Sequence, residues 1–180
     1  ELTMAVLDRE GVTNFAAAPT VYRALRGSGL EVPEDLALRC ASSAGEPLTP
    51  EINEWAREAL GVQVHDHYGQ TEAGMLVNNH HSPLVGGELK ERSMGREMPG
   101  WKTVILYDDR DEELDPGEMG RLAIRLADSP LAWFDGYHGD ARKTAEKFSA
   151  DGRYYITGDT AMVDDEGYFY FSARDDDVII

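Results

Sequence analysis

The sequence has few basic residues and almost no cysteine, and both shortages exclude classes of protein. Its 180 residues include 17 lysines and arginines against 34 aspartates and glutamates, so the formal net charge is -17. Nucleic acids and anionic membranes bind through basic side chains that neutralise phosphate, so this balance argues against both partners. The single cysteine, Cys40, cannot form an internal disulfide, and we therefore expect a cytoplasmic protein.

Several well-known patterns are also missing. No apolar run approaches the roughly 18 residues that a membrane-spanning helix needs, so we expect no membrane span. The sequence contains neither G-x-S-x-G, nor G-x-x-x-x-G-K-[ST], nor G-x-G-x-x-G, which disfavours serine hydrolases, Walker-type phosphate loops and Rossmann dinucleotide sites. His65, His67 and the adjacent His80 and His81 match no familiar zinc spacing.

The first half of the chain predicts a parallel sheet. Hydrophobic residues make up 42% of the sequence, enough for a core. Short apolar runs at residues 12–17, 36–41 and 62–65 are typical of strands, and we expect the first to be buried. Helical patterns that open at Pro19 and Pro50 alternate with them, and this alternation favours a mostly parallel sheet covered by helices.

The second half predicts antiparallel strands. After about Ser82, glycine and proline separate short strands at residues 102–107, 121–126, 153–157 and 168–173. Residues 164–167 are typical of a hairpin loop. Asp140 is expected to cap a short helix over residues 140–148.

The fold class is therefore predicted as α/β plus β. We expect part of a helix-covered, mostly parallel sheet over residues 1–85, followed by a small antiparallel β-barrel over residues 86–175. The chain has no initial Met and ends in Val178-Ile179-Ile180, which predicts a piece of a longer protein. The uncovered sheet of such a piece is expected to promote self-association.

An acidic run lies at residues 108–118, where seven acids surround one arginine. Calcium loops need a defined ligand spacing with a glycine at the sharp turn, and this run does not have it. We therefore predict a solvated hairpin loop rather than a cation site.

Four further segments carry functional side chains. Gly45 follows a predicted strand, where a small residue lets a ligand approach the backbone. The segment at residues 66–74, predicted as a loop after the next strand, offers an aromatic ring, a hydroxyl and a carboxylate. The predicted turn at residues 157–159 ends in Asp159, which can accept hydrogen bonds from ribose hydroxyls. Arg174 can bind phosphate or ribose oxygens.

Together these segments resemble one family, the adenylate-forming acyl-CoA synthetases, a superfamily that also includes adenylation domains and luciferases. The resemblance covers nearly the whole chain and rests on motifs in this order: Gly45-Glu46-Pro47, Tyr68-Gly69-Gln70-Thr71-Glu72, residues 117–122, Thr157-Gly158-Asp159, and Arg174 with Asp176-Asp177. Residues 93–100, together with Phe134-Asp135-Gly136-Tyr137 and Lys143-Thr144, resemble the branch that acts on medium-chain or aromatic acids.

The resemblance implies a two-step reaction. ATP and a carboxylic acid give an acyl-adenylate and pyrophosphate, and the thiol of CoA then displaces AMP to give a thioester. The cofactors implied are ATP and Mg²⁺, with CoA as co-substrate. The family also has a phosphate loop before the first residue present here and a lysine-bearing domain after the last, so this piece alone is expected to be inactive.

The resemblance also implies roles for individual residues. Thr71 and Glu72 are the implied catalytic residues, with Glu72 as the Mg²⁺ ligand. For the nucleotide, the implied contacts are an adenine wall of Gly45, Glu46 and Pro47, an acceptor for the adenine amine at Asp66, a stacking ring at Tyr68, and ribose contacts at Asp159 and Arg174.

Two more positions follow from the same motifs. Gly69 stands where acetate-using relatives carry a tryptophan, and the resemblance therefore implies an acyl pocket open to longer or aromatic acids. The alternative is that glycine is needed here only for a backbone turn with a positive φ. Asp176 implies the hinge to a mobile C-terminal domain, with residues 176–180 leading into it.

Three alternatives stay open. An adenylation domain that loads a carrier protein would use the same loops. A non-catalytic nucleotide-binding module, or a degenerate relative, would keep part of the pattern without turnover.

Overall fold

The computed structural model describes residues 2–174, which divide into two compact units. One unit comprises Glu1–His67 and Asn79–Arg92, and the other comprises Tyr68–Asn78 and Ser93–Ile180. Strand β3 (Val64–Gln70) begins in the first unit and ends in the second. Within residues 2–174, no helix is both long enough and apolar enough to cross a bilayer.

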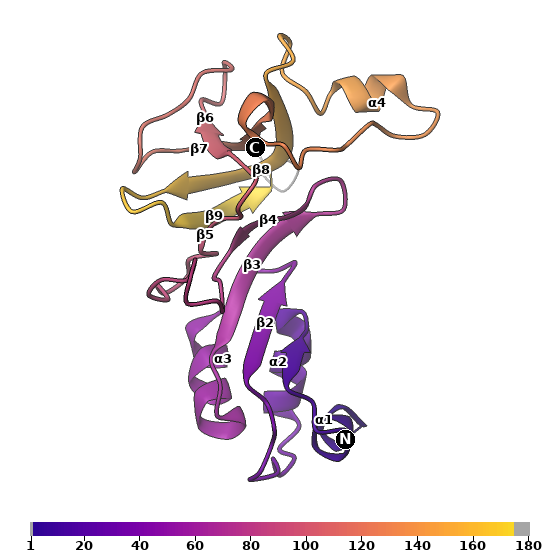
Figure 1. Ribbon diagram of the computed structural model, residues 1–180, viewed down its shortest axis with the longest axis vertical. Helices are drawn as coiled ribbons and strands as arrows, with labels where there is room; N and C mark the ends of the chain where they lie inside the picture. Colours follow the sequence, from indigo (N-terminus) through magenta and orange to yellow (C-terminus); the bar gives the residue numbers. More distant parts are fainter. Residues whose placement is uncertain (1, 175–180) are drawn as a thin grey trace. The chain divides into compact units, whose positions relative to one another are not determined.

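The first unit contains parallel strands, as the alternating pattern predicts. Strand β2 (Cys40–Ala44) pairs in parallel with β1 (Asn14–Ala16) on one side and with β3 on the other. The helices of this unit are α1 (Leu2–Arg9), α2 (Pro19–Gly27) and α3 (Pro50–Trp55), and α3 continues as the π-helix η1 (Ala56–Leu60) (Figure 1). A helix thus follows each of the first two strands, which is the connection that parallel strands require.

The core of this unit joins the helices to the strands. Its buried apolar residues are Met4, Leu7, Tyr22, Leu25, Leu38, Ala41, Leu48, Ile52, Ala56, Leu60 and Val64. Tyr22 is completely buried, and its hydroxyl lies 3.1 Å from the carbonyl oxygen of Phe15 and 3.0 Å from that of Ser42. Because these carbonyls belong to β1 and β2, one side chain of α2 satisfies backbone groups of both strands.

The strand predictions for this unit need three corrections. Strand β1 covers three residues and is partly exposed rather than buried, because β2 is its pairing partner on one side only. Strand β2 begins at Cys40 instead of Leu36. Strand β3 continues to Gln70, so residues 66–70, predicted as a loop, belong to the strand. Residues 66–70 carry polar side chains and therefore lack the apolar pattern of a buried strand. The parallel pairing of β3 with β2 nevertheless extends to His67.

The second unit contains antiparallel strands. Strand β4 (Gly74–Asn78) pairs with β5 (Arg96–Glu97). A four-stranded sheet follows, in the order β6 (Thr103–Leu106), β7 (Met119–Arg125), β8 (Tyr154–Val163) and β9 (Phe169–Arg174) (Figure 1). The core of this unit is formed by Tyr68, Ala73, Leu76, Val77, Met94, Trp101, Ile105, Leu122, Ile124, Tyr155, Ala161 and Phe169.

Local signals in this unit are confirmed at two places. Residues 164–167 connect the antiparallel strands β8 and β9, as the hairpin prediction states. Helix α4 (Ala141–Ala145) begins after Asp140, whose side chain accepts a hydrogen bond from the backbone of Lys143. Strand β8 is longer than predicted, because the supposed turn at residues 157–159 lies inside it, next to an irregularity in its pairing with β7 and β9.

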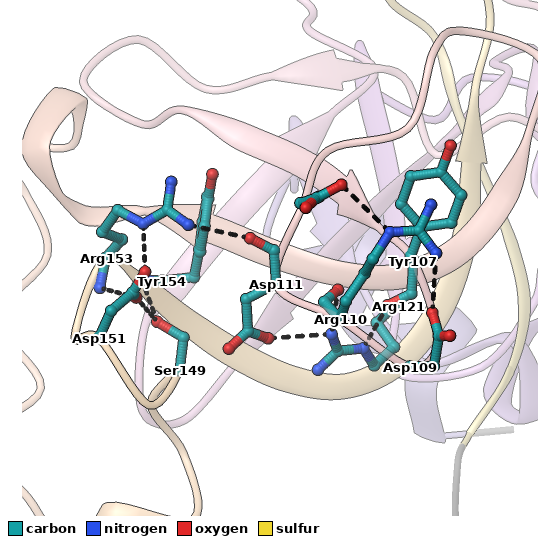
Figure 2. A network of polar contacts seen from close by, with 10 residues as sticks. Tyr107, Asp109, Arg110, Asp111, Arg121, Ser149, Asp151, Arg153 and Tyr154 are labelled. Carbon is teal, nitrogen blue, oxygen red and sulfur yellow. Dashed lines mark hydrogen bonds and ion pairs between the residues drawn. The ribbon is translucent and has the colours of Figure 1, made fainter.

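The acidic run forms the hairpin loop that the sequence predicts, between β6 and β7. Arginines bind its carboxylates and carbonyls: Arg110 pairs with Asp109 and Glu112, and Arg121 lies 3.0 Å from Asp111 (Figure 2). Among residues 2–174, no group of three or more His, Cys, Asp or Glu side chains has an arrangement that holds a metal ion. Asp109, Asp111 and Glu112 of this run are each paired with an arginine.

Candidate functional site

In the first unit, the loop after β2 presents Gly45, Glu46 and Pro47, all exposed. Gly45 has a φ of 94°, which other residues rarely adopt, so the turn requires glycine. The carboxylate of Glu46 accepts hydrogen bonds of 2.5 Å from the hydroxyl of Thr20 and from Arg23, both on α2. The hydrogen bond from Thr20 has the larger effect and that from Arg23 the smaller, and both lower the pKa of Glu46. The Glu46 side chain thus ties the loop to α2.

Asp66 lies on β3, opposite Ser43 of β2. Its carboxylate accepts hydrogen bonds from the backbone N–H of His67, at 3.1 Å, and from that of Leu48. Burial raises the pKa of Asp66 to about 7, despite these donors. The structure therefore places Asp66 against the segment that follows Pro47.

Three histidines of this unit form a ring cluster. The rings of His65 and His81 stack with centroids 3.6 Å apart, and the ring of His67 meets His81 edge-on at 6.4 Å. His65 Nδ1 donates to the carbonyl oxygen of Asn79 at 2.8 Å. Burial lowers the pKa of both His65 and His81, which favours their neutral forms.

In the second unit, a hydrogen-bond network joins the end of β3 to the middle of β8. The Tyr68 hydroxyl donates to Asp159 Oδ2 at 2.5 Å, although the two residues are 91 positions apart. Gln70 Nε2 lies 2.8 Å from the same oxygen, 3.2 Å from the Tyr68 hydroxyl and 2.9 Å from the carbonyl of Thr157. Burial, reinforced by the negative charge of Asp159, raises the pKa of Tyr68. We call Tyr68, Gln70 and Asp159 the β3–β8 network.

Three further side chains hold this network in place. The hydroxyl of Tyr155 donates to Gln70 Oε1 at 3.0 Å, so both ends of the Gln70 amide are bound. Lys147 Nζ donates to the carbonyl of Thr157 at 3.0 Å. The hydroxyl of Thr157 donates to the carbonyl of Leu122 at 2.7 Å and accepts from the backbone of Asp159. Asp159 is accordingly fixed both by its backbone and by its carboxylate.

Thr71 and Glu72 follow directly after β3. Thr71 is exposed and Glu72 is partly buried. Glu72 Oε1 accepts a hydrogen bond of 2.6 Å from the hydroxyl of Tyr137. This contact lowers the pKa of Glu72 and raises that of Tyr137 to about 12, because it stabilises the carboxylate and the protonated phenol. Glu72 is thus held as a carboxylate.

Close packing against β4 explains why residue 69 is a glycine. A Cβ at this position would lie 2.3 Å from the carbonyl oxygen of Gly74 and 2.8 Å from the Cα of Met75, in the neighbouring strand β4. Its φ lies outside the positive region, so the alternative of a positive-φ turn is wrong. Any side chain here would push against the β4 backbone.

The remaining predicted residues lie at the end of the described chain. The backbone of Arg174 on β9 lies opposite Asp159 on β8, so the two are neighbours in the sheet. The predicted hinge residue Asp176 lies outside the described residues.

An aromatic cavity of about 240 Å³ borders Glu72 in the second unit. It is lined by Glu72, Ala73, Trp101, Ile124, Leu126, Ala132, Trp133, Phe134, Phe148 and Tyr155. Gly69 is not part of this lining, so the cavity does not test the predicted acyl pocket.

The structure therefore groups the predicted residues by unit. Gly45, Glu46, Pro47 and Asp66 lie in the first unit, and Tyr68, Gly69, Thr71, Glu72, Asp159 and Arg174 in the second. Sequence reasoning assigned no role to Gln70, Tyr137 or Lys147. Gln70 binds Asp159, Tyr137 binds Glu72, and Lys147 binds the carbonyl of Thr157. Gln70 and Tyr137 stand within quoted motifs, but a contact across 65 or more positions has no local signal.

The sequence matches the family described as AMP-binding enzyme over residues 1–138. It is 38% identical over 170 residues to a mitochondrial acyl-coenzyme A synthetase of Homo sapiens, an alignment that covers 94% of this chain and 28% of the relative. It is 39% identical over 169 residues to 4-hydroxybutyrate–CoA ligase 1 of Metallosphaera sedula, covering 94% of this chain and 29% of the relative.

Solved structures of coenzyme A synthetases are also similar to this chain. An acyl-CoA synthetase of Brucella canis superposes with a TM-score of 0.85 and 42% identity, over 98% of this chain and 32% of that one. O-succinylbenzoate coenzyme A synthetase of Bacillus subtilis, in complex with ATP and magnesium ion, superposes with a TM-score of 0.76 and 27% identity, over 99% of this chain and 35% of that one. The chain thus spans about a third or less of the length of these relatives.

Proposed function

The chain belongs to the family of AMP-binding enzymes, and we propose that it is the part of an ATP-dependent acyl-CoA synthetase that holds the nucleotide. The whole protein would convert a carboxylic acid and ATP into an acyl-adenylate and pyrophosphate. The CoA thiol would then displace AMP and form the thioester. The observation that supports this most directly is the β3–β8 network, which joins two motifs of the resemblance in one hydrogen-bonded group.

The nucleotide contacts follow from the chemistry of these residues. Asp159 is a fixed carboxylate, and its acceptor oxygens suit ribose hydroxyls. Arg174, its neighbour in the sheet, would add a donor for the same ligand. We assign the adenine to the ring of Tyr68, to an acceptor at Asp66, and to a wall made by Gly45, Glu46 and Pro47.

Thr71 and Glu72 suit the reacting phosphate. The carboxylate of Glu72, with the exposed hydroxyl of Thr71 beside it, offers the hard oxygen donors that Mg²⁺ prefers, so these residues fit the ion that the family implies. When bound, Mg²⁺ supplies positive charge that lowers the repulsion between the anionic acid and the phosphates. Thr71 would donate its hydroxyl to a phosphate oxygen, and Glu72 would remain ionised.

For the acid, we propose a medium-chain or aromatic substrate, with Gly69 beside the acyl pocket. The close approach of β4 limits how this is tested, because Gly69→Trp would also disturb the backbone of Gly74. A panel of acids of increasing length, used with unmodified enzyme, avoids that problem. Each added methylene that is buried should contribute about 0.8 kcal/mol until the pocket is full.

Several finer features belong to the same proposal. We propose that the parallel strands form part of a larger helix-covered sheet and that the four-stranded sheet forms part of a small barrel. The boundary between these two subdomains is proposed near residue 85, and the hinge to a C-terminal domain at Asp176. A cytoplasmic location, self-association of the isolated chain and its inactivity alone are proposed with them.

The test is pyrophosphate release by the full-length protein across a panel of carboxylic acids, with and without CoA. We expect release that depends on a medium-chain or aromatic acid, and acyl-CoA when CoA is added. The same assay includes Asp159→Ala, which removes the proposed ribose acceptor. Its matched control is Asp165→Ala, which replaces an exposed aspartate of the β8–β9 loop.

Each alternative gives a different result. Release of pyrophosphate with no acyl-CoA would favour loading of a carrier protein. AMP binding without any turnover would favour a nucleotide-binding module, and neither binding nor turnover would indicate a degenerate relative.

A further inference from the structure

A short segment holds the residue that contacts Glu72. We call residues 134–145 the α4 strap, because this segment ends in helix α4. Asp140 caps the helix by accepting the backbone N–H of Lys143 at 2.9 Å. The hydroxyl of Thr144 donates to the carbonyl of Asp140 at 2.8 Å and accepts the backbone N–H of Tyr137 at 2.8 Å. The hydroxyl of Thr144 therefore ties the backbone of Tyr137 to helix α4.

The turn before Tyr137 closes tightly on the helix. Gly136 has a φ of 133°, and a Cβ there would lie 2.7 Å from Thr144 Cγ2. Both the backbone angle and the lack of space require glycine at this position. The close contact brings Tyr137 within reach of the Thr144 hydroxyl.

The ring of Tyr137 is held on two sides. Phe134 meets it edge-on with centroids 5.1 Å apart, and Lys143 Nζ lies 4.8 Å from its centroid. From this position the hydroxyl donates to Glu72 Oε1 at 2.6 Å, across 65 positions of sequence. The strap thus delivers one charge-assisted hydrogen bond to one carboxylate oxygen.

We propose that Tyr137 is a positioning residue that orients the carboxylate of Glu72 toward the metal–nucleotide complex. This inference rests on the proposed role of Glu72 as the metal ligand. A glutamate side chain has several rotatable bonds, and its freedom must be lost before it can bind an ion. The Tyr137 hydrogen bond restricts that freedom beforehand, which is the benefit of preorganisation.

The phenol hydroxyl can be removed with little other change. Tyr137 is only partly buried, and Tyr137→Phe keeps the ring that contacts Phe134 and Lys143. Tyr107→Phe is the matched control, because the Tyr107 ring packs against Arg110 of the acidic loop. Thr144→Val and Thr144→Ser form a second pair, since only serine keeps the hydroxyl that binds the backbone of Tyr137.

The experiment measures ATP affinity of the full-length protein by calorimetry, once with EDTA and once with saturating Mg²⁺. The ratio of the two dissociation constants is the metal-dependent gain. We expect Tyr137→Phe to reduce this gain about 3- to 10-fold while metal-free ATP affinity stays unchanged. Thr144→Val should reduce it less, Thr144→Ser should restore it, and Tyr107→Phe should match the unmodified protein.

Glu72→Gln separates the inference from its premise. If Glu72→Gln abolishes the gain and Tyr137→Phe leaves it intact, the positioning role is refuted while the proposed role of Glu72 stands. If Glu72→Gln keeps the full gain, the proposed metal role fails, and the inference fails with it. A Tyr137→Phe variant that loses metal-free affinity by the same factor would show a merely structural role, and that too would refute the inference.

Discussion

The β3–β8 network and the acidic loop are both built on carboxylates, but their surroundings differ. Asp159 is buried, and its carboxylate accepts hydrogen bonds from the hydroxyl of Tyr68 and the amide of Gln70. In the acidic loop the carboxylates are exposed or partly exposed, and arginines such as Arg110 bind them (Figure 2). The arginine pairs offset charge at the surface, whereas the donors around Asp159 hold a buried carboxylate in one orientation. Density of charge in the sequence is therefore a poor guide to a site, and burial with oriented hydrogen-bond donors is a better one.

The comparison predicts its largest effect at Asp159. Replacing it by alanine in the full-length protein removes charge-assisted hydrogen bonds to the ribose, which should cost on the order of 2–4 kcal/mol in kcat/KM for ATP. Steady-state kinetics with varied ATP measure the loss. Asp165→Ala should leave the same parameters within twofold, and equal effects of the two changes would remove the distinction between buried and exposed carboxylates.

Gln70 tests whether the network acts through Asp159. Gln70→Met keeps the length of the side chain but removes its bonds to Asp159 and Tyr155, so kcat/KM for ATP should fall by about 1–3 kcal/mol. With 2′,3′-dideoxy-ATP, which lacks the hydroxyls that Asp159 would bind, the same variant should lose much less. Gln63→Met, at the other glutamine of the chain, serves as the control. An equal loss with both nucleotides would mean that Gln70 supports the fold rather than the ribose contact.

Asp66 predicts a pH dependence of stability. The carboxyl titrates at 3.8 in the unfolded chain and at about 7 in the folded one, because burial favours its neutral form. Below pH 3.8 both states hold the proton; between the two values only the folded state does, so stability falls as the pH rises, by up to about 1.4 kcal/mol per pH unit. Above about pH 7 neither state holds the proton, so the contribution of Asp66 to the free energy of unfolding no longer changes with pH.

Asp66→Asn isolates this contribution. Urea unfolding at a series of pH values should give a variant whose stability changes less between pH 4 and 7 than that of the unmodified chain. Parallel curves for the two proteins would show that the Asp66 carboxyl does not titrate in that range.

The smallest effect is expected in the acidic loop. Glu112→Gln breaks an ion pair with Arg110 in which both side chains are well exposed, so unfolding free energy should change by less than about 0.5 kcal/mol. Urea unfolding at low and high salt measures it, since screening weakens exposed pairs. A loss above 1 kcal/mol would place the loop among the structural networks of the protein.

Local patterns were sufficient for part of the fold. Pro50 at the first helical position and Gly61 with a φ of 69° mark the start and end of α3 and η1, and both follow from backbone preferences of those residues. Asp140 caps α4 for the same kind of reason. Alternating strands and helices likewise indicated the parallel pairing of β1, β2 and β3.

Strand limits could not be predicted in the same way. Residues 66–70 and 157–159 carry polar side chains and glycine, so they look like loops, yet both lie within strands. Ladder hydrogen bonds are made by backbone groups, and a neighbouring strand can supply them whatever the side chains are. Gly69 shows the same limit, because its need for glycine arises from the β4 backbone and not from its own φ.

By itself, the sequence determined the order of the motifs, the change from alternating helices and strands to antiparallel strands, and the family that these features indicate. Tertiary structure alone decided which of those residues meet: Tyr68 and Gln70 with Asp159, and Tyr137 with Glu72. Local patterns reflect interactions within a few positions of the chain. Contacts across 65 to 91 positions depend on strand register and on the path of the α4 strap, which are set only when the whole unit has folded.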